Sequence, residues 1–71
     1  MKSIKLKDVK KGDRLFEHDS LGNSYLTALE DAHYENNEQG KGYFCKVLVD
    51  GDKEPMEFFD SGYWLNLYKV S

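Results

Sequence analysis

The sequence predicts a small, mostly β domain that folds as a five-stranded barrel or a strongly bent antiparallel sheet, with one short helix or 3₁₀ turn at most. Residues 43–49 form a β-branched and aromatic run with apolar side chains on both faces, which is typical of a central strand. Short apolar or alternating runs stand on both sides of it, separated by turns rich in Gly, Asn and Asp. We expect one domain over residues 1–71, because a chain of this length builds a single small core.

The N-terminal third of the chain predicts two strands and two turns. Residues 4–7 alternate apolar and basic side chains, as a half-exposed strand does. Residues 8–13 predict a turn in which Gly12 takes a positive φ. Residues 14–18 then predict a short strand, which is followed by a second turn at 19–24.

Residues 25–34 fit two patterns. In a strand, one face is formed by Leu26, Ala28, Ala32 and Tyr34, and Glu30 interrupts it. In a helix, Leu26, Leu29 and His33 share a face. Intrinsic propensity favours the helix, because Leu, Ala and Glu dominate the segment. The neighbouring turns and short strands favour the strand, which is the interpretation that we prefer.

The remaining segments continue the pattern of strands and turns. We expect an exposed polar loop at 36–42, a tight hairpin turn at Asp50-Gly51, a return strand at 54–59 with Pro55 near its start, a break at 60–62, a short 3₁₀ turn at 63–64 and a closing strand at 65–70.

Charge is unevenly distributed around a net value of −3. Residues 1–14 carry six basic and two acidic side chains, for +4, whereas residues 15–40 carry six acidic side chains and no Lys or Arg, for −6. The two segments either compensate each other in space or form two opposite patches that are open to partners. No apolar run approaches the ~20 residues that span a bilayer, and we expect no membrane association. The single cysteine, Cys45, indicates a reducing, cytoplasmic location.

No group of residues predicts catalysis or a cofactor. Cys45 lies in the most apolar strand and is expected to be a small buried hydrophobe. His18 and His33 are 15 residues apart, without the paired ligands that zinc sites show. The acidic segment 50–54 is too short for an EF-hand loop and lacks the distal Glu of that loop, and it is typical of a hairpin turn. We therefore expect a protein that is not an enzyme and binds neither a metal nor a cofactor.

Aromatic side chains cluster near the C-terminus. Five of them fall within eleven residues: Phe58, Phe59, Tyr63, Trp64 and Tyr68. They form either a second small core under a loop or an exposed patch of the kind that marks an interface. On the second interpretation, the partner-binding surface consists of Trp64, Tyr68, Tyr63 and Phe59, rimmed by Glu57 and Asp60.

The entry into the domain is similar to that of the SH3-like small barrels. In that superfamily an apolar residue, a basic turn and Gly-Asp often precede the first barrel strand, as residues 6–16 do around Gly12-Asp13. The resemblance implies a small β-barrel that binds peptides, nucleic acid or other subunits, and it does not choose among them. A short, acidic chain of this kind also resembles many small phage or mobile-element proteins.

Two functions follow as hypotheses. The first is a protein-interaction module of the adaptor or inhibitor type, indicated by the acidic balance and the aromatic cluster. Its acidic segment at 15–40 would suit it to imitate nucleic acid. The second is a nucleic-acid-binding barrel in which the basic residues of 1–14 contact phosphates and Tyr or Trp stacks on bases. The net charge of −3 disfavours tight nucleic-acid binding, so we prefer the first hypothesis.

Overall fold

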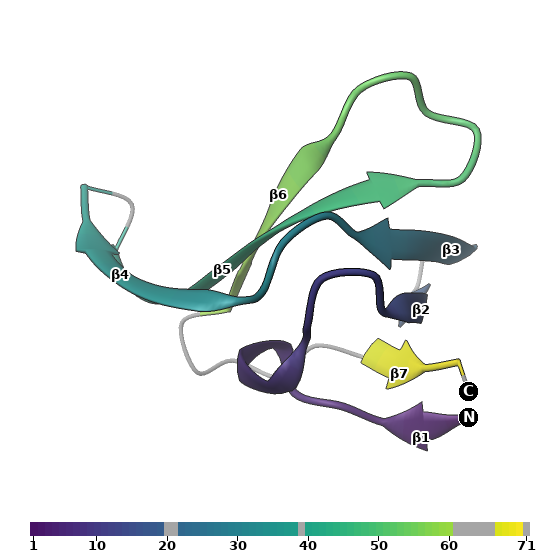
Figure 1. The fold of residues 1–71 in the computed structure, drawn as a ribbon, viewed down its shortest axis with the longest axis horizontal. Coiled ribbons are helices and arrows are strands. Elements are labelled where there is room, and N and C mark those ends of the chain that lie inside the picture. Colours follow the sequence, from purple (N-terminus) through teal and green to yellow (C-terminus); the bar gives the residue numbers. More distant parts are fainter. Residues whose placement is uncertain (20–21, 39, 61–66, 71) are drawn as a thin grey trace.

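The computed structural model describes residues 1–19, 22–38, 40–60 and 67–70. Seven strands are present in this part of the chain, rather than the five expected, together with one 3₁₀ turn: β1 (Lys2–Ser3), η1 (Leu6–Asp8), β2 (Arg14–Asp19), β3 (Gly22–Ala28), β4 (His33–Asn37), β5 (Gly40–Val49), β6 (Met56–Asp60) and β7 (Leu67–Lys69). They form one curled antiparallel sheet in the order β1-β7-β2-β3-β5-β4 (Figure 1). Strand β6 lies outside this order and pairs with the edge of β5 opposite to β3 and β4. The predicted fold class, a small bent β structure, is confirmed.

Strand β5 connects the two halves of this sheet, as the prediction of a central strand requires. One of its edges pairs first with β4 and then, from Val47 to Val49, with β3. Its other edge pairs with β6, from Tyr43 to Val47. The strand begins at Gly40, three residues before the predicted start, because it also forms one arm of the β4–β5 hairpin.

The ambiguous segment 25–34 is strand at 25–28 and 33–34 and contains no helix, so the strand interpretation is confirmed for those residues. It is divided into β3 and β4, which run in the same direction along β5. Between the pairs Ala28–Val47 and His33–Phe44, four residues on this arm oppose two on β5, so the arm bends. The predicted common face is therefore interrupted, and Tyr34 is 59% exposed.

Strands β2 and β3 form a hairpin whose register runs from Arg14–Thr27 to Asp19–Gly22. The predicted strand at 14–18 is thus confirmed, but it extends further into the expected turn at 19–24. Strand β7 pairs with the other edge of β2 and falls within the predicted closing strand, of which residues 65–66 lie outside the described residues. The expected 3₁₀ turn at 63–64 also lies outside them, as do residues 61–62 of the expected break.

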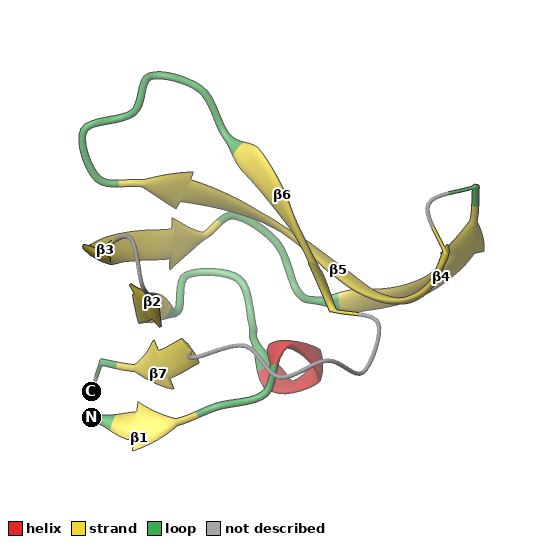
Figure 2. Ribbon diagram, turned by 180° about the vertical axis from the view of Figure 1, so that it is seen from behind, coloured by secondary structure: helices red, strands yellow, loops and turns green. Residues whose placement is uncertain are grey.

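Two predictions about local structure are wrong. Residues 4–7 do not form a strand, because Leu6 and Val9 both enter the core, and the three-residue spacing between them fits the 3₁₀ turn η1 (Figure 2). The polar segment 36–42 is not a loop, since pairing with the opposite arm of the hairpin holds most of it in β4 and β5.

The turn after β5 is only partly as expected. Gly51 has a φ of 90°, and the Asp52 N–H donates to the Val49 carbonyl over 3.0 Å. Strand β6 begins only at Met56, however, so the connection is a loop and not a two-residue turn. Gly12 also has a φ of 90°, as predicted for the first turn.

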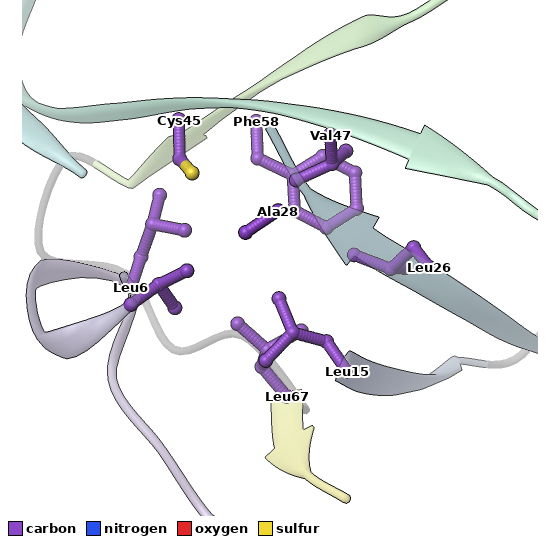
Figure 3. Close-up of a cluster of buried hydrophobic side chains, with 9 residues drawn as sticks. Leu6, Leu15, Leu26, Ala28, Cys45, Val47, Phe58 and Leu67 are labelled. Carbon is purple, nitrogen blue, oxygen red and sulfur yellow. The ribbon is translucent and has the colours of Figure 1, made fainter. Parts of the chain in front are cut away.

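The core lies on the inner face of the curl, the face toward which Leu15, Leu26 and Leu67 point (Figure 3). Val47 and Cys45 of β5 are completely buried there, and the prediction that Cys45 is a buried hydrophobe is confirmed. The nine buried members are Leu6, Val9, Leu15, Leu26, Ala28, Cys45, Val47, Phe58 and Leu67. Within the described ranges, no helix is long and apolar enough to cross a bilayer.

Candidate functional site

Three aromatic side chains form a row on the outer face of the sheet, the face opposite the core. Side chains alternate along a strand, so the burial of Leu15, Leu26 and Leu67 places their neighbours Phe16, Tyr25 and Tyr68 on the outer face. The register then puts Tyr25 opposite Phe16 on one side and Tyr68 opposite Phe16 on the other. We call these three residues the aromatic row.

The rings of the row pack against each other at an angle. The Phe16 and Tyr25 centroids are 5.0 Å apart with planes inclined by 55°, and the Phe16 and Tyr68 centroids are 6.3 Å apart with planes inclined by 46°. Such cross-strand aromatic pairs stabilise a sheet by ~0.2–1 kcal/mol each. Tyr25 nevertheless remains 44% exposed, so the row also presents apolar surface to solvent.

An ion pair lies beside Tyr25. The Arg14 guanidinium donates to both carboxylate oxygens of Asp50 and, over 3.0 Å, to the Thr27 hydroxyl. Its Cζ atom lies 5.5 Å from the centre of the Tyr25 ring. Hydrogen bonding to Asp50 raises the pKa of Arg14, and the same hydrogen bonding lowers the pKa of Asp50. Arg14 is thereby held against the ring, with its charge largely matched.

The predicted site residues on β6 are placed on two faces. Phe59 lies on the outer face and stacks on the buried Phe44, with ring centroids 4.6 Å apart. Glu57 lies on the same face and is exposed, opposite Lys46. Asp60 alternates to the inner face, where it pairs with Tyr43. Phe59 therefore packs on the ring of Phe44, whereas Phe58 of the same strand belongs to the main core.

The structure separates Tyr68 from the other predicted site residues that it describes. Tyr68 belongs to the aromatic row, whose far end is Tyr25. The backbone carbonyl of Tyr25 accepts a 2.9 Å hydrogen bond from the N–H of Asp50, the residue that follows β5. Phe59 lies opposite Phe44, six residues earlier on β5, which corresponds to about 20 Å of strand. Tyr63 and Trp64 lie outside the described residues.

Sequence reasoning missed Phe16 and Tyr25. Each is next to a leucine that enters the core, so the alternation of side chains along a strand turns each of them outward. Their contact depends on the register of the β2–β3 hairpin, in which the residue numbers of paired positions sum to 41.

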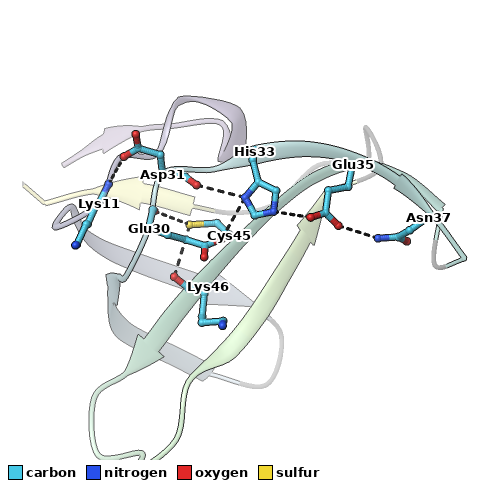
Figure 4. Close-up of polar contacts among 8 residues, drawn as sticks. All are labelled: Lys11, Glu30, Asp31, His33, Glu35, Asn37, Cys45 and Lys46. Atoms are coloured by element: carbon cyan, nitrogen blue, oxygen red, sulfur yellow. Dashed lines mark hydrogen bonds and ion pairs between the residues drawn. The ribbon is translucent and has the colours of Figure 1, made fainter.

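The histidine at the start of β4 belongs to a polar network (Figure 4). His33 Nε2 is 2.9 Å from Glu35 Oε1, and His33 Nδ1 is 3.2 Å from Glu30 Oε2. Desolvation alone would lower the pKa of His33, but hydrogen bonds to the Asp31 carbonyl and Glu35, with the charge of Glu30, raise it overall. Glu35 Oε2 also accepts a hydrogen bond from the Asn37 amide over 2.9 Å.

Cys45 is held as a thiol. Its Sγ donates to the Glu30 carbonyl oxygen over 3.3 Å (Figure 4). Burial, assisted by nearby carboxylates, raises the pKa of Cys45 to about 11, so the nucleophilic thiolate is scarce at neutral pH. Among residues 1–19, 22–38, 40–60 and 67–70, no group of three His, Cys, Asp or Glu side chains is arranged to hold a metal ion.

No protein-family model, curated protein or solved structure matches this chain. We therefore infer the class of protein from the chain's own surface and chemistry.

Proposed function

We propose that this chain is a non-enzymatic protein-interaction module that binds its partner through the aromatic row. One observation carries the proposal: Phe16, Tyr25 and Tyr68 lie side by side on the outer face, and none of them belongs to the buried core cluster. Tyrosine suits such a surface because it offers a large amphipathic ring and loses little side-chain entropy on binding. The Arg14–Asp50 pair beside it provides oriented polar groups for hydrogen bonds at the rim.

The placement of charge supports a protein partner over nucleic acid. The basic residues Lys5, Lys7, Lys10 and Lys11 lie on the segment that inserts Leu6 and Val9 into the core from the inner side. They are therefore on the opposite side of the sheet from the aromatic row. Arg14, which does adjoin the row, is already paired with Asp50. Nucleic-acid affinity draws mainly on unpaired cations that track the phosphates, beside rings that stack on bases.

The chemistry of the reactive side chains supports a role other than catalysis. Cys45 is buried and protonated, and both ring nitrogens of His33 are engaged by carboxylates. His18 contacts the side chain of Asn23 on the exposed β2–β3 hairpin. We also infer a reducing compartment such as the cytoplasm, because Cys45 is a free thiol. The adaptor or inhibitor role, and an origin in a phage or mobile element, belong to the same proposal.

The test compares partner capture by matched surface variants. The wild-type chain, Tyr25→Ala and Met56→Ala serve as baits in a native-host extract, with quantitative mass spectrometry of the bound proteins. Tyr25 and Met56 are similarly exposed, at 44% and 47%, but Met56 lies on β6, away from the row. A genuine partner should be lost by at least tenfold with Tyr25→Ala and be retained by Met56→Ala, in keeping with the ~2 kcal/mol of a hot spot. Equal capture of every bound protein by all three baits would show that the aromatic row does not bind the partner.

A further inference from the structure

Strand β4 has an edge to which no described strand is paired. Its other edge pairs with β5 over all five residues, His33–Asn37. The sheet order ends at β4, which lies at the far left of the ribbon in Figure 1, away from β1 and β7. A strand of five residues offers about 17 Å of backbone donors and acceptors along such an edge. Edges of this kind accept an added strand from another chain.

The edge of β4 lacks most of the features that block strand addition. It contains no proline, lysine or bulge, and four of its five residues are exposed. The opposite end of the sheet differs, since β1 is two residues long and carries Lys2. We confine the inference to β4, because β6 is followed directly by residues 61–66, which lie outside the described residues.

The two faces of β4 favour different side chains in a strand that pairs with it. His33 and Glu35 share the outer face, and Glu30 lies close to His33 there. Tyr34 alternates to the inner face, where its ring meets that of Tyr43 edge-on at 5.6 Å. Lys41, the nearest lysine on β5, pairs with Asn36 and so lies on the inner face, away from Glu35.

Charge also argues against a second copy of the chain as the occupant. Two β4 edges that paired antiparallel about their centres would set Glu35 directly against Glu35. Like charges in directly opposed positions destabilise a strand pair. No Lys or Arg lies between residues 15 and 40 to relieve this repulsion. His33 contacts Glu35 and Glu30 and offsets part of their charge, but two carboxylates face one imidazole, so the outer face of β4 still attracts a strand that places a cation opposite Glu35.

We propose that the open edge of β4 accepts an extended peptide of a partner protein in which basic and apolar residues alternate. The peptide joins the sheet as an added strand beside β4. Its basic side chains lie next to Glu35 on the outer face, and its apolar side chains lie next to Tyr34 on the inner face. This surface is separate from the aromatic row, so the chain would hold two binding surfaces.

The probe is the capped peptide Lys-Val-Lys-Val-Lys-Val-Lys, titrated into the ¹⁵N-labelled full chain and followed by NMR. We expect amide shifts concentrated on β4 and the facing half of β5. Two further peptides carry N-methyl groups on alternate residues, in the two possible phases. An added strand uses the N–H groups of one phase only, so one methylated peptide should lose binding while the other keeps it. Equal binding of both methylated peptides, or shifts spread over other acidic segments, would refute strand addition.

Charge variants test the choice of partner. Glu35→Lys should weaken binding of the Lys-Val peptide about fivefold and improve binding of a Glu-Val peptide, because one opposed pair changes from attraction to repulsion. Asp52→Lys makes the same change in net charge on the loop after β5 and should leave both affinities within about twofold. Tyr25→Ala should leave binding of the Lys-Val peptide unchanged. The test of strand addition at β4 is therefore independent of the test of partner binding by the aromatic row. Equal effects of Glu35→Lys and Asp52→Lys would reduce the interaction to unspecific attraction and overturn the proposal.

Discussion

Replacing Val47 by alanine removes the equivalent of two methylene groups from the centre of the core. Val47 is completely buried and lies in the cluster formed by β2, β3, β5, β6, β7 and the η1 segment. At ~0.8 kcal/mol for each buried methylene, the lost transfer free energy is about 1.6 kcal/mol. The cavity left behind adds to this, so the free energy of unfolding should fall by about 2–3 kcal/mol.

That loss is large for a chain of 71 residues. A domain of this size has a free energy of unfolding of about 4–10 kcal/mol, so Val47→Ala should remain folded. Val47→Asp is more severe, since it places a carboxylate in a core where no described polar or charged residue is buried. An uncompensated buried charge costs about 3–5 kcal/mol, in addition to the lost packing. We expect this variant to be largely unfolded.

Urea denaturation followed by far-UV circular dichroism measures both effects. With a slope of ~1 kcal/mol per molar urea, Val47→Ala should lower the midpoint by about 2–3 M. Lys46→Ala is the matched control, because Lys46 is the preceding residue of β5 and points outward into solvent. It should change the free energy of unfolding by no more than about 1 kcal/mol, the value of its cross-strand contact with Glu57. If the two alanine variants had the same midpoint, the assignment of the inner face of β5 would be refuted.

Four further predictions concern titration, reactivity and the aromatic residues. In the folded chain the pKa of His33 should lie above its ordinary value of 6.5, which NMR of the ring protons would show. Protonated His33 should therefore stabilise the fold fully below pH 6.5, and this contribution should be lost as pH rises through the folded pKa. Comparing the stability of the wild-type chain with that of His33→Gln across this pH range measures the loss. Because the pKa of Asp50 is lowered in the folded chain, ionised Asp50 should add a small amount to the free energy of unfolding above the pKa of an unfolded Asp, and this contribution should be lost as pH falls. Asp50→Asn should therefore lower the urea midpoint at pH 7 more than at pH 3. Cys45 should react with a thiol reagent at least a hundredfold faster in denaturant than in the native state; equal rates would show that its burial is wrong. For Trp64, which lies outside the described residues, the prediction comes from the sequence alone: Trp64→Ala should leave the melting temperature nearly unchanged and weaken partner binding, and a blue-shifted, quencher-resistant emission from Trp64 would place it in the core instead.

The residues that sequence analysis placed correctly are those whose role is fixed by local pattern. The β-branched run around Val47 has apolar side chains on both faces, and it is the strand on which both halves of the sheet depend. Gly12 and Gly51 stand in turns that require a positive φ. In these cases a few neighbouring residues determine the local structure, so one sequence is enough.

The errors occur where pairing or packing with another segment, near or far along the chain, decides the structure. Leu6 alternates with lysines as a strand residue would, yet the core accepts it through a 3₁₀ turn together with Val9. Asn36 and Asn37 have poor strand propensity, yet pairing across the β4–β5 hairpin holds them extended. The aromatic row was missed for the same reason, because Phe16 and Tyr68 meet only after β7 has joined β2.

The alternation of side chains along β2 and β3 separates the stability of the fold from the character of its outer surface. Leu26 is completely buried, and its truncation to alanine would cost about 2–5 kcal/mol of the free energy of unfolding. Tyr25, its immediate neighbour, is half exposed, and its truncation removes a cross-strand pair worth ~0.2–1 kcal/mol. A domain whose free energy of unfolding is about 4–10 kcal/mol remains folded after truncation of Tyr25, whereas truncation of Leu26 removes much of that free energy. Substitutions on the outer face can therefore change what this chain binds while the inner face keeps it folded, which is the property that a small interaction module requires.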